Sequence, residues 1–64
     1  MNNEIDNLII YEFMNSLTDD ERRALELKLA GYKHREIAEE MGRGKNVITR
    51  IFGVIRDKAN RWWN

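Results

Sequence analysis

At 64 residues the chain is one domain at most, and its apolar core can contribute only marginal stability. It has no cysteine, which excludes disulfides and thiolate zinc sites, and no proline, which favours helices. No apolar run approaches the roughly 20 residues that span a bilayer, and the start lacks the basic residues of a secretion signal, so we expect a cytoplasmic protein. The net charge is zero, but seven acids and three bases give residues 1–30 a charge of −4, and eight bases and four acids give residues 31–64 a charge of +4. The second half can therefore attract the phosphates of DNA. Because the basic surplus is modest, we expect weak binding by the domain alone and additional affinity from a partner.

The first expected helix covers about residues 4–15 and is apolar around much of its circumference. One apolar stripe along it consists of Ile5, Leu8, Ile9 and Phe13. A second group beside this stripe consists of Ile10, Met14 and Leu17, and Tyr11 lies outside both groups. A small core covers part of this surface and leaves one or two large side chains exposed. A protein partner, or the edge of a longer protein, is an equally good explanation of that surplus.

The second expected helix, about residues 19–30, has the strongest local signal in the chain. Thr18 and Glu21 have the spacing of a capping box, in which each side chain bonds the backbone amide of the other residue. The expected buried residues are Ala24, Leu25 and Leu29, with Leu27 as a further candidate. Gly31 ends the helix as a left-handed cap.

Residues 34–59 have the pattern of a helix-turn-helix, with helices at about 33–41 and 45–62 and a turn at 42–44. The side chains that pack the two helices together are Ile37, Ala38, Met41, Ile48, Ile51 and Phe52. Gly42 can take the positive φ that ends the first of these helices. With the apolar face inward, four polar side chains must share the outer face of the second helix: Lys45, Asn46, Thr49 and Arg50. Such side chains can read base edges in a DNA major groove, although they also suit an ordinary solvated surface.

Other chemistry has little support in this sequence. His34 has no partners at metal-ligand spacing, and Ser16 has neither a glycine-rich elbow nor a nearby base, so we expect no catalytic residue, no metal and no cofactor. Trp62 and Trp63 are adjacent at a helix end, so we expect one to pack over the first helix and the other to lie at the rim.

From Leu17 to Ala59 the sequence resembles region four of bacterial sigma factors, the domain that reads the −35 promoter element. The matching segments are LTDDERRALEL, KHREIAEEMG and a closing helix with apolar residues at 48, 52, 55 and 59. The spacing is most similar to the sigma-H-like and extracytoplasmic-function branches. Departures are Gly44 and Lys45 at the start of the closing helix, Gly53 within it, and Ala59 and Asp57 farther along. No segment of this chain fits the sigma domain that melts DNA, so the resemblance implies either the C-terminal domain of a sigma factor or a stand-alone sigma-like regulator.

The resemblance implies an all-α, four-helix domain over residues 1–64 that binds duplex DNA. It implies that Lys45, Asn46, Thr49 and Arg50 read bases. The implied backbone contacts are Lys33, Arg35, Arg43 and Arg56. Its first two helices would meet the β-subunit flap of RNA polymerase, and an anti-sigma protein is a further expected partner of a domain that is monomeric alone.

Two other functions stay open at this point. One is a regulator of the LuxR type that dimerises through its closing helix. The other is an adaptor of RNA polymerase or of a sigma factor that has kept the fold and lost DNA reading; the low net charge and Gly53 favour it slightly.

Overall fold

The computed structural model describes the backbone of residues 3–63 and the side chains of residues 8–63, which excludes the side chain of Ile5 from the description. Within this range the chain forms four α-helices: α1 (Asn3–Ser16), α2 (Asp19–Leu29), α3 (His34–Met41) and α4 (Lys45–Trp63). This part of the chain has no strand. The predicted all-α, four-helix class is therefore confirmed.

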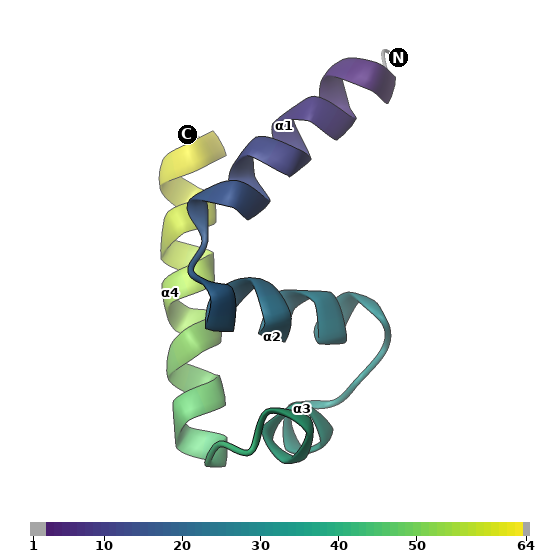
Figure 1. The fold of residues 1–64 in the computed structure, drawn as a ribbon. Coiled ribbons are helices and arrows are strands. Elements are labelled where there is room, and N and C mark those ends of the chain that lie inside the picture. Colours follow the sequence, from purple (N-terminus) through teal and green to yellow (C-terminus); the bar gives the residue numbers. More distant parts are fainter. Residues whose placement is uncertain (1–2, 64) are drawn as a thin grey trace.

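Helices α2, α3 and α4 enclose the main apolar core. The long helix α4 runs along one side of the molecule, α2 meets it near its middle, and α3 lies beyond α2 at the end where α4 begins (Figure 1). The buried side chains of this cluster are Ala24, Leu27, Ile37, Ala38 and Ile48, and Met41, Ile51 and Phe52 pack against them. Ile37 and Ile48 have no exposed surface, so the helix-turn-helix is fixed by apolar burial.

The C-terminal half of α1 joins the molecule through a second cluster made of Phe13, Leu17 and Ile55. Toward its N-terminus α1 projects away from α2 (Figure 1), and three large apolar residues of α1 are exposed: Leu8, Ile10 and Tyr11. More apolar surface is thus uncovered than the one or two side chains predicted.

The two tryptophans at the end of α4 do not divide their roles as predicted. Both rings lie against Phe13, with centroid separations of 6.0 Å for Trp62 and 4.9 Å for Trp63. Both also keep about half of their surface exposed. The prediction was wrong because only the last turns of α1 lie against the end of α4, so both rings share a single phenylalanine of α1.

Two glycines end α2 and α3 in the same way. Gly31 has φ 101° and Gly42 has φ 65°, the left-handed conformation predicted for both. At each end the residue after the glycine donates its amide five residues back, Tyr32 to the Leu27 carbonyl and Arg43 to the Ala38 carbonyl, both at 3.0 Å. These are the bonds of a Schellman motif, which reverses the chain sharply. The sharp reversal at Gly42 sets the start of α4 beside the end of α3.

The buried face of α2 differs from the prediction at one residue. Ala24 and Leu27 are buried and Leu25 is half-buried, but Leu29 is 74% exposed. At 100° per residue Leu29 lies about 140° around the helix from Ala24, so both cannot face the same core. The prediction that Leu29 is buried was therefore wrong, and Leu27, three residues after Ala24, takes the inward position.

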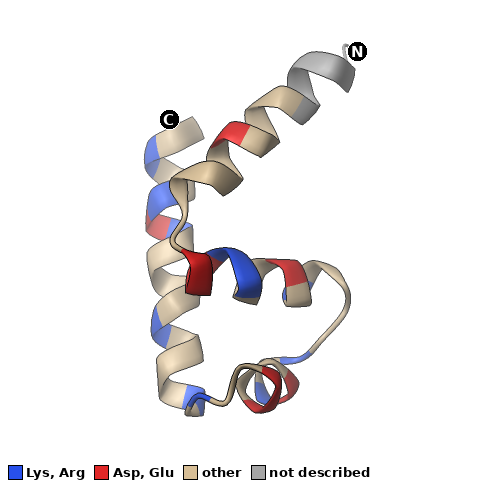
Figure 2. Cartoon of the chain, in the orientation of Figure 1, with Lys and Arg blue, Asp and Glu red and all other residues tan. Residues whose placement is uncertain are grey.

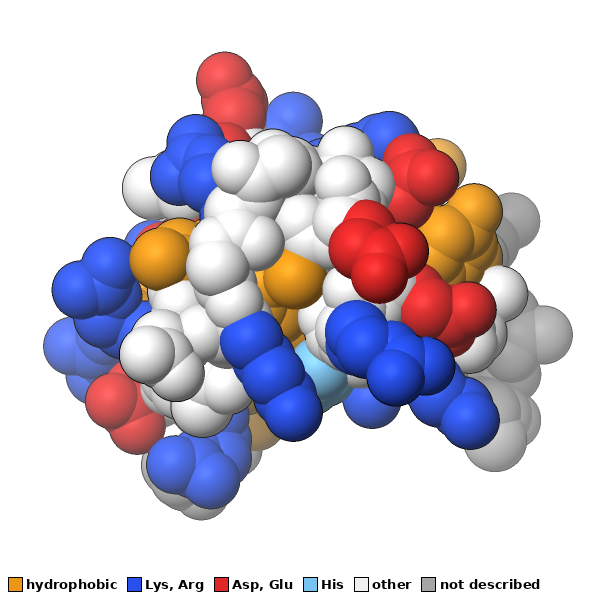
Figure 3. Space-filling model, turned by 90° about the horizontal axis from the view of Figure 1, so that it is seen from below, with side chains coloured by type: hydrophobic (Ala, Val, Ile, Leu, Met, Phe, Trp, Pro, Cys, Tyr) orange, Lys and Arg blue, Asp and Glu red, His pale blue; other side chains and the backbone are white. Residues whose placement is uncertain are grey.

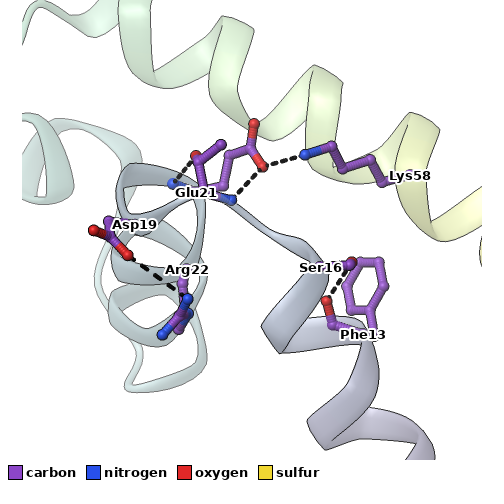
Figure 4. Close-up of polar contacts among 7 residues, drawn as sticks. Phe13, Ser16, Asp19, Glu21, Arg22 and Lys58 are labelled. Atoms are coloured by element: carbon purple, nitrogen blue, oxygen red, sulfur yellow. Dashed lines mark hydrogen bonds and ion pairs between the residues drawn. The ribbon is translucent and has the colours of Figure 1, made fainter.

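The capping box at the start of α2 is present and has a third member that lies far away in the sequence. The Glu21 amide donates to the Thr18 hydroxyl at 3.2 Å, and the Thr18 amide donates to the Glu21 carboxylate at 3.0 Å. The Lys58 ammonium, from α4, donates to the same carboxylate oxygen at 2.7 Å (Figure 4). Burial alone would raise the pKa of Glu21, but the bonds from Lys58 and Thr18 outweigh it and hold that pKa below its ordinary value of 4.5.

We expect this lowered pKa to make the stability of the domain depend on pH. Since the folded pKa lies below the unfolded one, the stabilisation is fully present above about pH 4.5 and is lost as pH falls through the folded pKa. Glu21→Gln keeps a capping side chain but removes the charge facing Lys58, and it should lower the free energy of unfolding at pH 7 by about 1–2 kcal/mol.

Thermal melts of both proteins from pH 7 to pH 3 measure this effect. The difference between wild type and Glu21→Gln should shrink as pH falls below about 4.5. A difference that stays constant across that range would show that the ion pair with Lys58 is not its source.

Candidate nucleic-acid interface

The outer face of α4 presents the four polar residues that the sequence placed together. Lys45, Asn46, Thr49 and Arg50 are all exposed, while Ile48 between them is fully buried. At 100° per residue the four occupy an arc of about 140° on one side of the helix. Arg56, two turns farther along, is exposed within the same arc. The helix therefore carries a continuous polar surface opposite its buried face.

The first turn of α3 lies beside the middle of α4. The His34 ring stacks on the Phe52 ring with centroids 4.8 Å apart and planes 6° from parallel. Lys33 and Arg35, on either side of this histidine, are exposed. This stack could not be predicted from the sequence, because it depends on how α3 and α4 cross. The stack places the start of α3, with the predicted DNA-backbone contacts Lys33 and Arg35, near the polar face of α4.

Arg43, in the turn between α3 and α4, has a protein partner that the sequence did not reveal. Its guanidinium lies 2.9 Å from the carboxylate of Asp20 in the first turn of α2, and both side chains remain about half exposed. A guanidinium has five N–H donors, so one carboxylate leaves others free. Arg43 thus joins α2 to the turn and keeps donors available at the surface.

The start of α4 differs from the start of α2 in its charge. The first turn of α2 contains Asp19, Asp20 and Glu21, whereas the first turn of α4 contains no acid. Gly44, which precedes α4, has no side-chain oxygen to accept from the free amides there. An uncapped helix start favours anions, because its amides and the helix dipole both present positive charge.

Charge is distributed unevenly over the molecule. Basic residues occur along the length of α4, and acidic residues mark the start of α2 (Figure 2). On the face formed by α3 and the start of α4, basic side chains form several separate groups with acidic ones between them (Figure 3). Because Asp20 and Glu21 pair with Arg43 and Lys58, two of the bases in the second half of the chain are already partly neutralised. The interface is therefore only moderately positive.

The described residues offer little support for other kinds of site. No group of three His, Asp or Glu side chains there is arranged to hold a metal ion. None of the described helices combines the length and apolar character required to cross a membrane. A shallow, open hollow near the end of α4 is lined by Ser16, Lys58, Arg61 and Trp62. Lys58 is occupied by Glu21, so this hollow is a minor feature beside the polar face of α4.

Comparison with known proteins agrees with this arrangement. The sequence profile of the family described as Sigma-70, region 4 matches residues 7–48, which include most of α1, all of α2 and α3, and the start of α4. Thr49, Arg50 and Arg56 lie beyond the matched residues. No curated protein and no solved structure matches the chain. The family acts in transcription by binding DNA and is not enzymatic. Since the match covers about two thirds of the sequence and the fold has the four helices and the helix-turn-helix, the chain belongs to the sigma-70 region 4 family.

Proposed function

We propose that this domain reads a promoter element of the −35 type in duplex DNA, with the outer face of α4 in the major groove. The observation that carries the proposal is the joint exposure of Lys45, Asn46, Thr49 and Arg50 over the buried Ile48. Arg50 suits the O6 and N7 acceptors of guanine, and Asn46 suits the N6 and N7 edge of adenine. These two residues would supply most of the sequence preference.

The phosphate contacts in this proposal come from three places around that face. Lys33 and Arg35 lie at the start of α3, Arg43 in the turn, and Arg56 farther along α4. The uncapped start of α4 adds free amides to the same surface. Because the basic surplus is small, the domain alone should bind DNA weakly and with a shallow salt dependence.

A selection of bound duplexes from a random pool, at low salt, tests the proposal. We expect one short sequence to be enriched, and more strongly when RNA polymerase is present. Failure to bind any duplex at low salt while polymerase binding persists would instead select the adaptor function. Enrichment of two inverted half-sites, together with a dimer in sedimentation, would instead select a regulator of the LuxR type.

We further propose that α1 and α2 contact RNA polymerase, at the flap of its β subunit. The family is one whose members interact with the polymerase. The support in this chain is the exposed apolar surface of α1, which includes Leu8, Ile10 and Tyr11. Leu8 and Tyr11 are three residues apart and share one face of α1, and large apolar side chains exposed together in this way mark protein-binding sites. A double substitution, Leu8→Ser with Tyr11→Ser, should weaken binding to the isolated flap and leave binding to duplex DNA unchanged.

A further inference from the structure

Gly53 stands in the middle of α4, where the fold itself has no need of a glycine. It does not have a positive φ, unlike Gly31 and Gly42. A Cβ atom added at Gly53 would meet no atom within 4 Å, so no neighbouring helix requires its absence. A glycine inside a helix costs about 0.5–1 kcal/mol relative to alanine. No conformational or packing requirement of the fold therefore explains this loss of stability.

The position of Gly53 on α4 relates it to the proposed DNA interface. At 100° per residue Gly53 falls inside the arc of the four proposed reading residues, one turn after Thr49. Arg56 follows it by three residues, and residues at this spacing are neighbours on a helix surface. Gly53 is thus a stretch of bare backbone on the outer face of α4, between the proposed base contacts and a proposed phosphate contact.

The distance along the helix indicates what would lie against this bare backbone. Gly53 is eight residues beyond Lys45, which is about 12 Å at 1.5 Å per residue. The major groove is about 8.5 Å deep, and helices of this kind enter it at an angle by their N-terminal residues. A helix that enters at Lys45 therefore reaches the rim of the groove, where the sugar–phosphate strand runs, near Gly53.

We infer that α4 rests against the sugar–phosphate strand at Gly53, and that the missing side chain lets the strand approach closely enough for Arg56 to hold its phosphate. The inference rests on the proposed function and adds a positioning residue to it. A methyl group at residue 53 would hold the strand away from the helix and would lengthen the distance between the Arg56 guanidinium and the phosphate. Because the strand carries no sequence information, the effect should be the same on every duplex.

The test is Gly53→Ala, compared with wild type in thermal melts and in titrations of a selected and a scrambled duplex at one salt concentration. We expect a higher melting temperature together with an affinity lower by about 3- to 10-fold on both duplexes, where tenfold corresponds to about 1.4 kcal/mol. A purely structural glycine would not give opposite changes in stability and binding. Unchanged or tighter binding, or a lower melting temperature, would overturn the inference.

Two matched variants complete the experiment. Asn60→Ala also adds a helix-forming residue to the exposed surface of α4, and it should raise the melting temperature without changing affinity. An equal loss of affinity in Asn60→Ala would mean that a stiffer helix, and not the added methyl, weakens binding, which refutes the inference. In Arg56→Ala, adding Gly53→Ala should cost little further affinity; full additivity would refute the link to Arg56. If wild type binds neither duplex, the proposed function fails instead.

Discussion

Replacing Ile48 with alanine should remove a large share of the free energy of unfolding of the domain. Ile48 is fully buried where α4 meets α2 and α3, so the substitution removes apolar contacts and leaves a cavity. Such truncations cost about 2–5 kcal/mol. A domain of this length has a total stability of about 3–10 kcal/mol, at 0.05–0.15 kcal/mol per residue. Helix content followed by circular dichroism during urea and thermal unfolding measures the loss.

Ile10→Ala is the matched control for this prediction. It makes the same chemical change on α1, at a side chain that is 52% exposed. Its effect on the free energy of unfolding should stay within about 0.5 kcal/mol. Comparable losses in Ile10→Ala and Ile48→Ala would contradict the core assignment, and with it the geometry that turns the polar face of α4 outward.

Replacing Arg50 with alanine should remove much of the preference for the selected duplex over a scrambled one. A bidentate contact between arginine and guanine discriminates by about 1–3 kcal/mol, or roughly 5- to 150-fold in affinity. Binding to the scrambled duplex should fall far less. Fluorescence anisotropy titrations of both duplexes at several salt concentrations give the two affinities and their salt dependence.

Arg35→Ala provides the contrasting variant, because Arg35 is a proposed phosphate contact. It should weaken binding to both duplexes by the same factor and reduce the slope of log affinity against log salt by about 0.9. If Arg50→Ala also lowers both affinities equally, Arg50 contacts the backbone and does not read a base.

Features that depend on neighbours three to five residues apart could be predicted correctly. The capping box of Thr18 and Glu21 and the left-handed caps at Gly31 and Gly42 are of this kind. So is the joint exposure of Lys45 and Arg50 over Ile48, because helical periodicity alone separates those positions. Their roles in DNA binding stay predictions.

Contacts between helices could not be predicted in this way. Lys58 lies 37 residues from Glu21, and Arg43 is far from Asp20 in sequence. Both pairs form because α2 meets α4 near its middle, which brings the start of α2 within reach of side chains from α4 and from the turn before it. The stack of His34 on Phe52 and the shared contact of both tryptophans with Phe13 have the same origin. On α2 the periodicity admitted more than one apolar face, and only packing excluded Leu29.

By itself the sequence determined the helices, their ends and the residues that α4 turns outward, because each of these follows from interactions within one or two helical turns. The tertiary structure alone decided which bases are paired with the acids of α2. It also decided how much of α1 is left uncovered. Both depend on where helices cross, and crossing is fixed by the summed packing of side chains that are distant along the chain.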